Sequence, residues 1–292
     1  TISNVGSLSG VINNEVTITN GSGSANFLSA NVAYSGSSVT SQAVSVTGLA
    51  LSGTNPGNYT LTQPTGITAT ITPKALTVSG VTVANKVYDS TTAAVISARG
   101  NLSGIVSGDV VSINSSSGSA VFASADVAYS SGSVTSQAVT ISGLSLTGAA
   151  AGNYSVAQPS GVVATITPKA LTISGITATT SKQYDQTNSV AVSGTPSLTG
   201  SASSSTDGKY YGSDVGITGA VTASYNSVNV ATANQIAFDI SGVSLTGSAA
   251  KVGDYTLTAL TPVAGAITPK SLTVSGLTVA STKVYDNTTS AT

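Results

Sequence analysis

The chain has 292 residues, of which only 7% are charged, and its formal net charge is −1. Histidine and cysteine are absent, which excludes the commonest neutral-pH proton shuttle, thiolate chemistry and zinc–sulfur sites. So small a net charge offers no basic surface for nucleic acid. Mean hydropathy is +0.30, yet no apolar run reaches the roughly 18 to 20 residues that cross a bilayer. We therefore expect neither nucleic-acid binding nor membrane insertion of this chain.

The first predicted strand covers residues 15–19, where apolar and polar side chains alternate with the period of a half-buried strand. It ends at Asn20-Gly21, and alternation followed by Asn-Gly is a strong signal for a tight hairpin. We therefore expect the return strand to begin near residues 24–27. Further short strands, separated by turn signals, are predicted at residues 46–51, 59–62 and 67–71.

The chain then repeats itself. Ile-Thr-Pro-Lys begins at residues 71, 166 and 267, a spacing of about one hundred residues, which is the length of a small domain. Because Thr1 reads as mid-strand and methionine is absent, we expect an internal piece of a longer chain. The predicted units are 1–73, which lacks its first strands; 74–168, which is complete; 169–269, which is complete and the most divergent; and 270–292, which supplies the opening strands of a further unit.

The fold class indicated by these patterns is all-β. No window free of Gly and Pro has helical apolar spacing, and β-branched residues dominate the predicted elements, as strands favour. Six to eight short strands per hundred residues predict sandwich-like domains. A β-helix is the alternative, but it would repeat every 20 to 30 residues or so. Since a lone Pro separates the units, the tandem array is predicted to be an elongated, semi-rigid rod.

Few residues could carry chemistry, and most of them recur. A residue present in every unit of an array is better explained as a turn or sheet-edge device than as a catalyst, so we expect no enzyme activity and no cofactor. Tyr88 is expected to pack its ring on a sheet, and Asp89 to accept an amide hydrogen bond from Thr91 or Thr92 in an Asx turn. A ligand-facing aromatic beside a carboxylate is the functional alternative. The recurring residues are Pro73, Lys74, Tyr88 and Asp89; Pro168, Lys169, Tyr184 and Asp185; and Pro269, Lys270, Tyr285 and Asp286.

Three less favoured sites remain open. Asp207 and Asp214 lie in an insertion of the third unit, but calcium needs more carboxylates, so a solvated loop is the preferred interpretation. A Lys–Asn isopeptide bond would need a buried acid, and no obvious one is present. Exposed aromatic rings can stack on sugars, and the candidate stacking residues are Tyr34, Tyr129, Tyr210 and Tyr211.

Pro-Lys-Ala-Leu-Thr-Val-Ser-Gly at 73–80, followed by Lys-Val-Tyr-Asp-Ser-Thr-Thr-Ala-Ala at 86–94, resembles the YDG-type repeat and the related MBG repeat of large exported bacterial adhesins, of the haemagglutinin and filamentous-haemagglutinin kind. Gly152-Asn153-Tyr154 and the Ser-Gly-Leu-Ser-Leu-Thr-Gly segment also belong to this pattern. The chain departs from the family at the namesake glycine, which is Ser90, Gln186 and Asn287 here. A position that accepts Ser and Gln is predicted not to need a positive φ.

The resemblance implies a secreted protein at the bacterial cell surface or in a biofilm matrix, whose repeats form a non-catalytic stalk. Partners would be host or matrix glycans or proteins, bound through the full-length adhesin. A glycan-binding module and a self-associating fibre repeat are the alternatives, because a surface so poor in charge has little repulsion against edge pairing.

Overall fold

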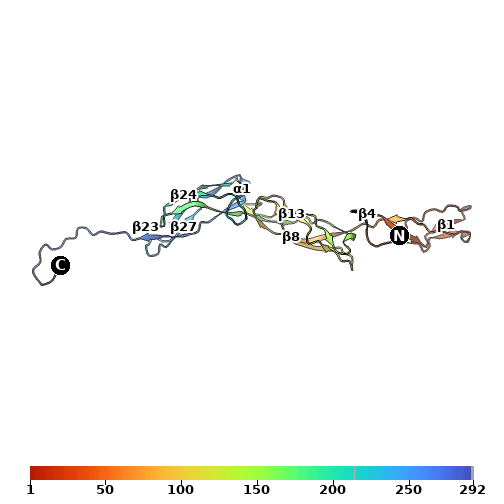
Figure 1. Ribbon diagram of the computed structural model, residues 1–292, viewed down its shortest axis with the longest axis horizontal. Coiled ribbons are helices and arrows are strands. Elements are labelled where there is room, and N and C mark those ends of the chain that lie inside the picture. The colour runs from red at the N-terminus through yellow and green to blue at the C-terminus, as the bar shows by residue number, and fades with distance from the viewer. Residues whose placement is uncertain (213–214, 291–292) are drawn as a thin grey trace. The chain divides into compact units, whose positions relative to one another are not determined.

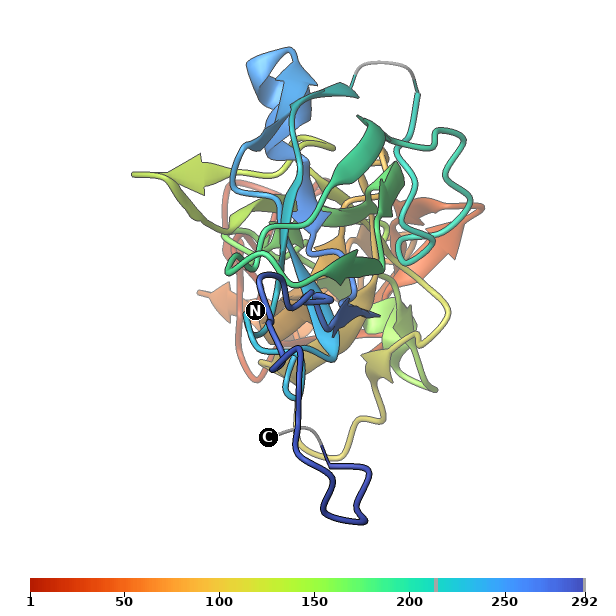
Figure 2. The same ribbon diagram turned by 90° about the vertical axis from the view of Figure 1, so that its left-hand side faces the viewer.

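The computed structural model describes residues 1–212 and 215–290. Short strands joined by turns make up nearly all of it in both views (Figures 1 and 2), which confirms the all-β prediction. The helical elements of the described residues are the single turns η1 (Pro56–Asn58) and η2 (Ala151–Asn153) and the five-residue α1 (Ala249–Gly253). Within the described ranges, no helix is both long enough and apolar enough to span a membrane.

The chain divides into two compact units. Unit 1 consists of Thr1–Ala84, Thr92–Ala123 and Gln137–Ala164, and unit 2 of Asn85–Thr91, Ser124–Ser136 and Thr165–Thr292. These units do not follow the sequence repeats, because the second repeat contributes to both. Each unit therefore contains a place where one repeat meets the next.

In unit 1, the first repeat forms one long antiparallel ladder with a break in the middle. β1 (Val16–Thr19) pairs with β6 (Ala50–Gly53), and β2 (Ser24–Phe27) pairs with β5 (Gln42–Thr47). β7 (Thr68–Ala69) joins the other edge of β5, while β3 (Ala33–Ser35) and β4 (Ser38–Thr40) form a hairpin.

The hairpin predicted at Asn20-Gly21 is wrong. Both strands exist, but they follow one another along the same partner, Thr19 opposite Ala50 and Ser24 opposite Thr47. Gly21 adopts a φ of 50°, and a Cβ there would lie 2.9 Å from Ala50 Cβ and from the Gly48 oxygen. The glycine is therefore needed for close approach at a break in the ladder, which the Asn-Gly pair alone does not distinguish from a turn.

The second repeat is built around one long strand in unit 1. β8 (Lys74–Val83) lies between β11 (Ile96–Ser103), which is antiparallel to it, and β18 (Tyr154–Val156), which is parallel. Leu76 of β8 is completely buried, and Phe122 and Ile141 are 3% exposed. The other strands are β10 (Ala93–Ala94), β13 (Ser119–Phe122), β16 (Gln137–Ser142) and β19 (Val163–Ala164), which form a four-stranded sheet, and the pair β12 (Ser112–Ile113) and β17 (Leu146–Thr147).

Unit 2 contains the third repeat and parts of the second. Its core includes the completely buried Ile166, Leu171 and Ile236. The antiparallel pairs are β14 (Tyr129–Ser130) with β15 (Ser133–Val134), β22 (Ser174–Ala178) with β24 (Val192–Ser197), β25 (Val215–Gly219) with β28 (Val243–Gly247), and β26 (Thr222–Tyr225) with β27 (Gln235–Asp239), which also pairs with β30 (Val263–Ala264). The parallel pairs are β9 (Lys86–Val87) with β20 (Ile166–Thr167), β21 (Lys169–Thr172) with β29 (Tyr255–Thr258), and β23 (Ser181–Gln183) with β31 (Ala266–Thr268).

Pro168 is the only residue between two strands that belong to different repeats. β20 before it pairs with β9 of the second repeat, and β21 after it pairs with β29 of the third. After the equivalent Pro269 the chain behaves differently. Residues 270–290, dark blue in Figure 1, form no strand, and Leu272 is 89% exposed.

Candidate functional site

The Lys-x-Tyr-Asp motif forms a local turn. Asp89 Oδ1 accepts the Thr91 amide and the Thr91 hydroxyl, each at 2.9 Å, and Lys86 Nζ lies 2.7 Å from the same oxygen. This Asx turn, stabilised by a lysine, recurs at Lys182–Asp185 and at Lys283–Asp286. The lysine ammonium and one oxygen of the aspartate are thereby bonded within the turn itself.

The prediction for the namesake position of the motif is wrong. Ser90, Gln186 and Asn287 all have positive φ, of 63°, 68° and 55°. The aspartate can bond the amide two residues later only if the chain turns at the residue between them. In all three copies that residue has a left-handed backbone conformation. Side chains other than glycine occupy that region at an energetic cost, so tolerance of Ser and Gln does not exclude it.

The tyrosine of each Gly-Asn/Asp-Tyr turn is anchored to a loop of its own repeat. Tyr154 donates to Asp109 Oδ2 at 2.5 Å and accepts the Val106 amide at 3.0 Å. The bond to the Asp109 carboxylate raises the pKa of Tyr154. Tyr59 contacts Glu15 in the same way at 3.5 Å. The sequence places Asp214 at this position of the third repeat, and Asp214 lies outside the described residues. In that repeat the hydroxyl of Tyr255 accepts the Tyr211 amide at 2.9 Å.

The turn also reaches the preceding repeat, and we call this contact the joint. In unit 1, the Val32 amide donates to Asn153 Oδ1 at 2.9 Å, and Asn153 Nδ2 donates to Asn31 Oδ1 at 2.8 Å. The Tyr34 hydroxyl donates to the Gly152 carbonyl at 2.8 Å. The side chains of Asn31 and Tyr34 and the backbone amide of Val32, all of the first repeat, therefore bind the η2 turn of the second repeat.

Unit 2 contains the same joint one repeat later. The Val127 amide donates to Asp254 Oδ1, and the Tyr129 hydroxyl donates to the Gly253 carbonyl, both at 2.7 Å. Asp126 and Asp254 stand where unit 1 has Asn31 and Asn153. Two carboxylates thus replace two amides, and a cation, Lys251 of α1, accompanies them.

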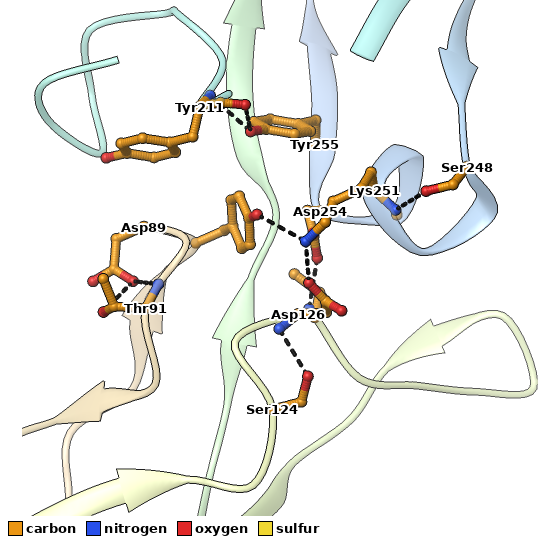
Figure 3. Close-up of polar contacts among 12 residues, drawn as sticks. Asp89, Thr91, Ser124, Asp126, Tyr211, Ser248, Lys251, Asp254 and Tyr255 are labelled. Carbon is orange, nitrogen blue, oxygen red and sulfur yellow. Dashed lines mark hydrogen bonds and ion pairs between the residues drawn. The ribbon is translucent and has the colours of Figure 1, made fainter. Parts of the chain in front are cut away.

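Lys251 lies between the two acids (Figure 3). Its ammonium is 2.6 Å from Asp126 Oδ1 and 3.6 Å from Asp254 Oδ2. Asp254 is completely buried, and its Oδ2 has no hydrogen-bond partner. Burial, with the charge of Asp126, raises the pKa of Asp254 against the opposing effects of the Val127 amide and Lys251. The hydrogen bond from Lys251 lowers the pKa of Asp126.

Aromatic rings cover this cluster. Tyr88 is 2% exposed, and its ring meets Tyr255 edge-on with centroids 5.2 Å apart, and Tyr211 at 6.0 Å. Burial raises the pKa of Tyr88 to about 12, so its hydroxyl stays protonated at neutral pH. Tyr88 belongs to the second repeat and the other two rings to the third, so the motif tyrosine packs across the joint as well as on its own repeat.

Lys169 is the one motif lysine that the described residues bury completely. Its ammonium lies 2.7 Å from Asp207 and donates to the Ser204 carbonyl. Asp207 Oδ2 accepts the Ser203 amide at 2.7 Å, and these bonds hold the pKa of Asp207 well below its usual range. The insertion of the third repeat is therefore a cap over Lys169 rather than the expected solvated loop. Within the described ranges, no three acids gather as metal ligands would.

The buried acid that an isopeptide bond requires is present in Asp254, although the sequence pattern did not reveal it. The residues beside Lys251 are the aspartates Asp126 and Asp254, and the hydrogen bond that Lys251 donates to Asp126 raises the pKa of Lys251. A protonated amine is not a nucleophile. The arrangement is therefore an ion pair.

The other residues singled out in the sequence do not gather at one site. Tyr34 and Tyr129 have their hydroxyls in the joints, while the two residues as a whole are 43% and 45% exposed. Tyr210 is half-buried against Gly200, and Tyr184 packs on the cluster around Tyr225. The remaining motif residues are dispersed along the chain: Lys74 is exposed at the start of β8 after Pro73, and Lys270 and Tyr285 lie exposed in the segment after Pro269.

A groove of unit 1 runs between β8 and the loop that follows β18. Its walls are Thr77–Val83 and Ala157–Val163, which contain no charged and no aromatic residue. Such a surface can offer hydroxyls and backbone groups, but it has neither a stacking platform nor a general acid or base.

Comparison with protein families supports the repeat assignment. The model of the YDG domain matches residues 72–161 and again residues 167–262. The chain belongs to the YDG domain family. Each match runs beyond a Gly-Asn/Asp-Tyr turn, so both sides of the unit 2 joint lie inside matched residues, whereas residues 31–34 of the unit 1 joint precede the first match. Searches of curated proteins and of solved structures return no match.

The joint of the YDG repeats was missed from the sequence. Its contacts join residues more than one hundred positions apart, Tyr34 with Gly152 and Tyr129 with Gly253, and neither partner is unusual in type. A signal was nevertheless present, because Ala-Tyr-Ser and Gly-Asn/Asp-Tyr recur together from repeat to repeat.

Proposed function

We propose that this chain is a non-catalytic stalk region of a secreted bacterial surface or biofilm-matrix adhesin, in which tandem YDG repeats extend a binding region away from the cell. The observation that carries this proposal is the joint. Tyrosine-to-glycine and amide-to-carboxamide or carboxylate bonds recur at equivalent places in unit 1 and unit 2. A contact reproduced from one repeat to the next gives an array a constant geometry.

The connection between repeats supports the same proposal. Only Pro168 separates the last strand of the second repeat from the first strand of the third, so the link has few free dihedral angles. A chain joined in this way favours an elongated, semi-rigid rod over loosely linked domains.

The side-chain chemistry supports a non-catalytic role. The groups whose pKa values shift furthest are engaged in structural contacts: Lys251 and Tyr88 at the joint, Asp207 with Lys169, and Asp185 in its Asx turn. None of them faces the groove of unit 1, whose lining is uncharged. These charged residues thus stabilise the fold and the joint.

Small-angle scattering of the 292-residue chain tests the stalk. We expect a maximum dimension far above that of a sphere of the same mass, and a compact particle would refute the proposal. The double variant Tyr34→Phe, Tyr129→Phe removes both joint hydroxyls and should broaden the distance distribution. Tyr210→Phe, outside the joints, is the matched control and should leave the profile unchanged. Antibody labelling of intact source cells tests the location, since a purely internal protein would remain unlabelled.

A second candidate function is glycan binding by the same tyrosines. It is favoured by residues that remain nearly half exposed while their hydroxyls are fixed, which is a suitable platform for stacking on sugars. Screening on a carbohydrate array should show binding that Tyr129→Ala abolishes and Tyr129→Phe retains. Binding that survives Tyr→Ala at both Tyr34 and Tyr129 would exclude this function.

A further inference from the structure

The chain has a single arginine, Arg99, whose guanidinium is held in place by one bond and is otherwise unsatisfied. Arg99 belongs to β11, and its Nε donates to the Ser117 carbonyl at 3.2 Å. Within the described ranges this is the only hydrogen bond of its side chain, and every ion pair there is formed by a lysine. The two terminal nitrogens of the guanidinium therefore have no acceptor in this part of the protein.

A hollow of about 470 Å³ lies beside this guanidinium, between the edges of two strands. Its walls are residues 99–102 of β11 and residues 111–113, which include β12. Successive residues of a strand point to opposite faces, so a wall of consecutive residues is the edge of the strand. In the described chain β11 pairs only with β8 and β12 only with β17, and neither partner lines the hollow. The hollow is therefore bordered by two unpaired edges.

The lining of the hollow is mostly apolar, with one positive charge. Its exposed side chains, apart from Arg99, are serines and an asparagine, and its half-buried ones are aliphatic: Leu102, Ile105, Val111 and Ile113. The lining contains no acid and no aromatic residue, so nothing in the hollow neutralises Arg99. An arginine binds a carboxylate through two parallel N–H bonds. Charge and polarity are thus complementary to a carboxylate carried next to an aliphatic group.

We propose that an extended peptide, with an acidic residue among aliphatic residues, binds in this hollow as an added strand along the free edge of β11. Main-chain hydrogen bonds to an open edge supply affinity in this mode of recognition, and alternate side chains supply specificity. The acidic side chain accepts the terminal N–H groups of Arg99. An aliphatic side chain two positions away, on the same face of the peptide, lies against Leu102 and Ile113.

The observations favour a peptide over an acidic glycan. Two unpaired strand edges offer donors and acceptors at the spacing of a peptide backbone, whereas the hollow has no aromatic ring on which a sugar could stack. The site is separate from Tyr34 and Tyr129, so the inference stands or falls independently of the stalk and of glycan binding at the joints.

Fluorescence anisotropy with the full 292-residue chain tests the proposal. The probe is a labelled pentapeptide, Thr-Val-Glu-Val-Thr, with both ends blocked. We expect saturable binding that Arg99→Val weakens at least tenfold. Valine suits this position because the first repeat has Val5 at the matching place of the Ile-Ser-x-x-Gly-x-Leu-Ser pattern. Lys74→Gln removes a cation of unit 1 outside the hollow and should leave binding unchanged. No saturable binding, or equal binding by wild type and Arg99→Val, would overturn the proposal.

Changes to the probe test the same contacts without altering the protein. Glutamine in place of the glutamate should weaken binding to wild type at least tenfold, and should have no effect on the Arg99→Val variant, because the two charges act as a pair. Equal affinity of wild type for both peptides would reject the ion pair. Methylation of alternate backbone amides should abolish binding, and full binding of that peptide would reject strand addition. A hyaluronan tetrasaccharide carries carboxylates on sugar rings, and its displacement of the probe would reject a peptide as the ligand.

Discussion

Gln186 has a left-handed backbone at the centre of an Asx turn that is otherwise fully hydrogen-bonded. For an L-residue this conformation costs roughly 1 to 2 kcal/mol, and glycine avoids the cost while losing about 0.5 to 1 kcal/mol of chain entropy. Gln186→Gly should therefore stabilise the protein by up to about 1 kcal/mol. Chemical denaturation measures the change. Gln186→Ala keeps the strain and serves as the control, and an equal gain in both variants would contradict the explanation.

Lys169 and Asp207 form a pair whose lysine is completely inaccessible to solvent. Removing the aspartate leaves the charge of the buried Lys169 uncompensated. Asp207→Ala should therefore lower the free energy of unfolding, measured by urea denaturation. Asp239→Ala removes a carboxylate that bonds the amide and the side chain of the nearby Ser241 and should cost far less. Equal losses would show that the pair is not a special stabilising feature.

At the scale of single residues, the sequence supports predictions about local chemistry better than about distant contacts. The Asx turn follows from an aspartate two residues before a threonine, and the structure has it at Asp89 and Asp185. Burial of Asp254 could not be predicted, because it depends on a loop 127 residues away. The positive φ at Ser90 was missed because residue type limits backbone conformation only loosely outside glycine and proline.

Among the elements, the break in the long ladder of the first and second repeats is held by a glutamine. In the second repeat Gln158 accepts the Leu144 amide at 2.9 Å and donates to the Leu144 carbonyl at 3.0 Å. Gln63 does the same for Leu49 in the first repeat, at 3.1 and 3.0 Å. The amide side chain thus takes the place of a neighbouring strand where the backbone pairing is interrupted.

Replacing this glutamine should therefore destabilise the second repeat. Gln158→Ala leaves both backbone groups of the buried Leu144 without a partner, which costs about 1 to 3 kcal/mol. Gln158→Glu keeps an acceptor for the amide and loses the donor, so it should fall between wild type and Ala at neutral pH. Hydrogen exchange of the Leu144 amide reports the effect locally. Unchanged exchange in Gln158→Ala would exclude the glutamine as the anchor.

Strand positions were more predictable than strand partners. The alternation at 15–19 locates β1, because that signal is local, but the strand predicted at 59–62 after Gly57-Asn58 is wrong, since those residues form no strand. Pairing is not local. Val16–Thr19 pairs with Ala50–Gly53 rather than with the strand that follows it, since the same Asn-Gly pair can reverse a chain or interrupt a ladder.

For the whole molecule, the lack of histidine predicts a flat stability profile between about pH 6 and 8, since no unperturbed side-chain pKa lies there. Acid should destabilise the fold. Asp185 has its pKa lowered to about 2 by Lys182, so its contribution is present above the unfolded value of about 3.9 and is lost as the pH falls through 2. Urea denaturation at several pH values measures both regions.

Asp254 is the expected exception to this profile. Burial raises its pKa, so its contribution to stability is full below the unfolded value and is lost as the pH rises through the folded one. Asp254→Asn recreates the amide pair of unit 1 and gives the unpartnered oxygen position a donor, which should add about 1 to 3 kcal/mol at pH 7. The gain should disappear near pH 3. A gain that is independent of pH would show that ionisation of Asp254 is not its cause.

The first and last strands of the second repeat determine how this repeat would resist a pull on its two ends. Within the second repeat, the first strand, β8, runs parallel to β18, and the last strand, β20, runs parallel to β9. When the two ends of such a repeat are pulled apart, the hydrogen bonds of these parallel ladders lie across the direction of the load and are sheared together rather than unzipped one by one. A repeat that is loaded in this way resists extension until several bonds break at once, and the single proline transmits the load to the next repeat with little slack.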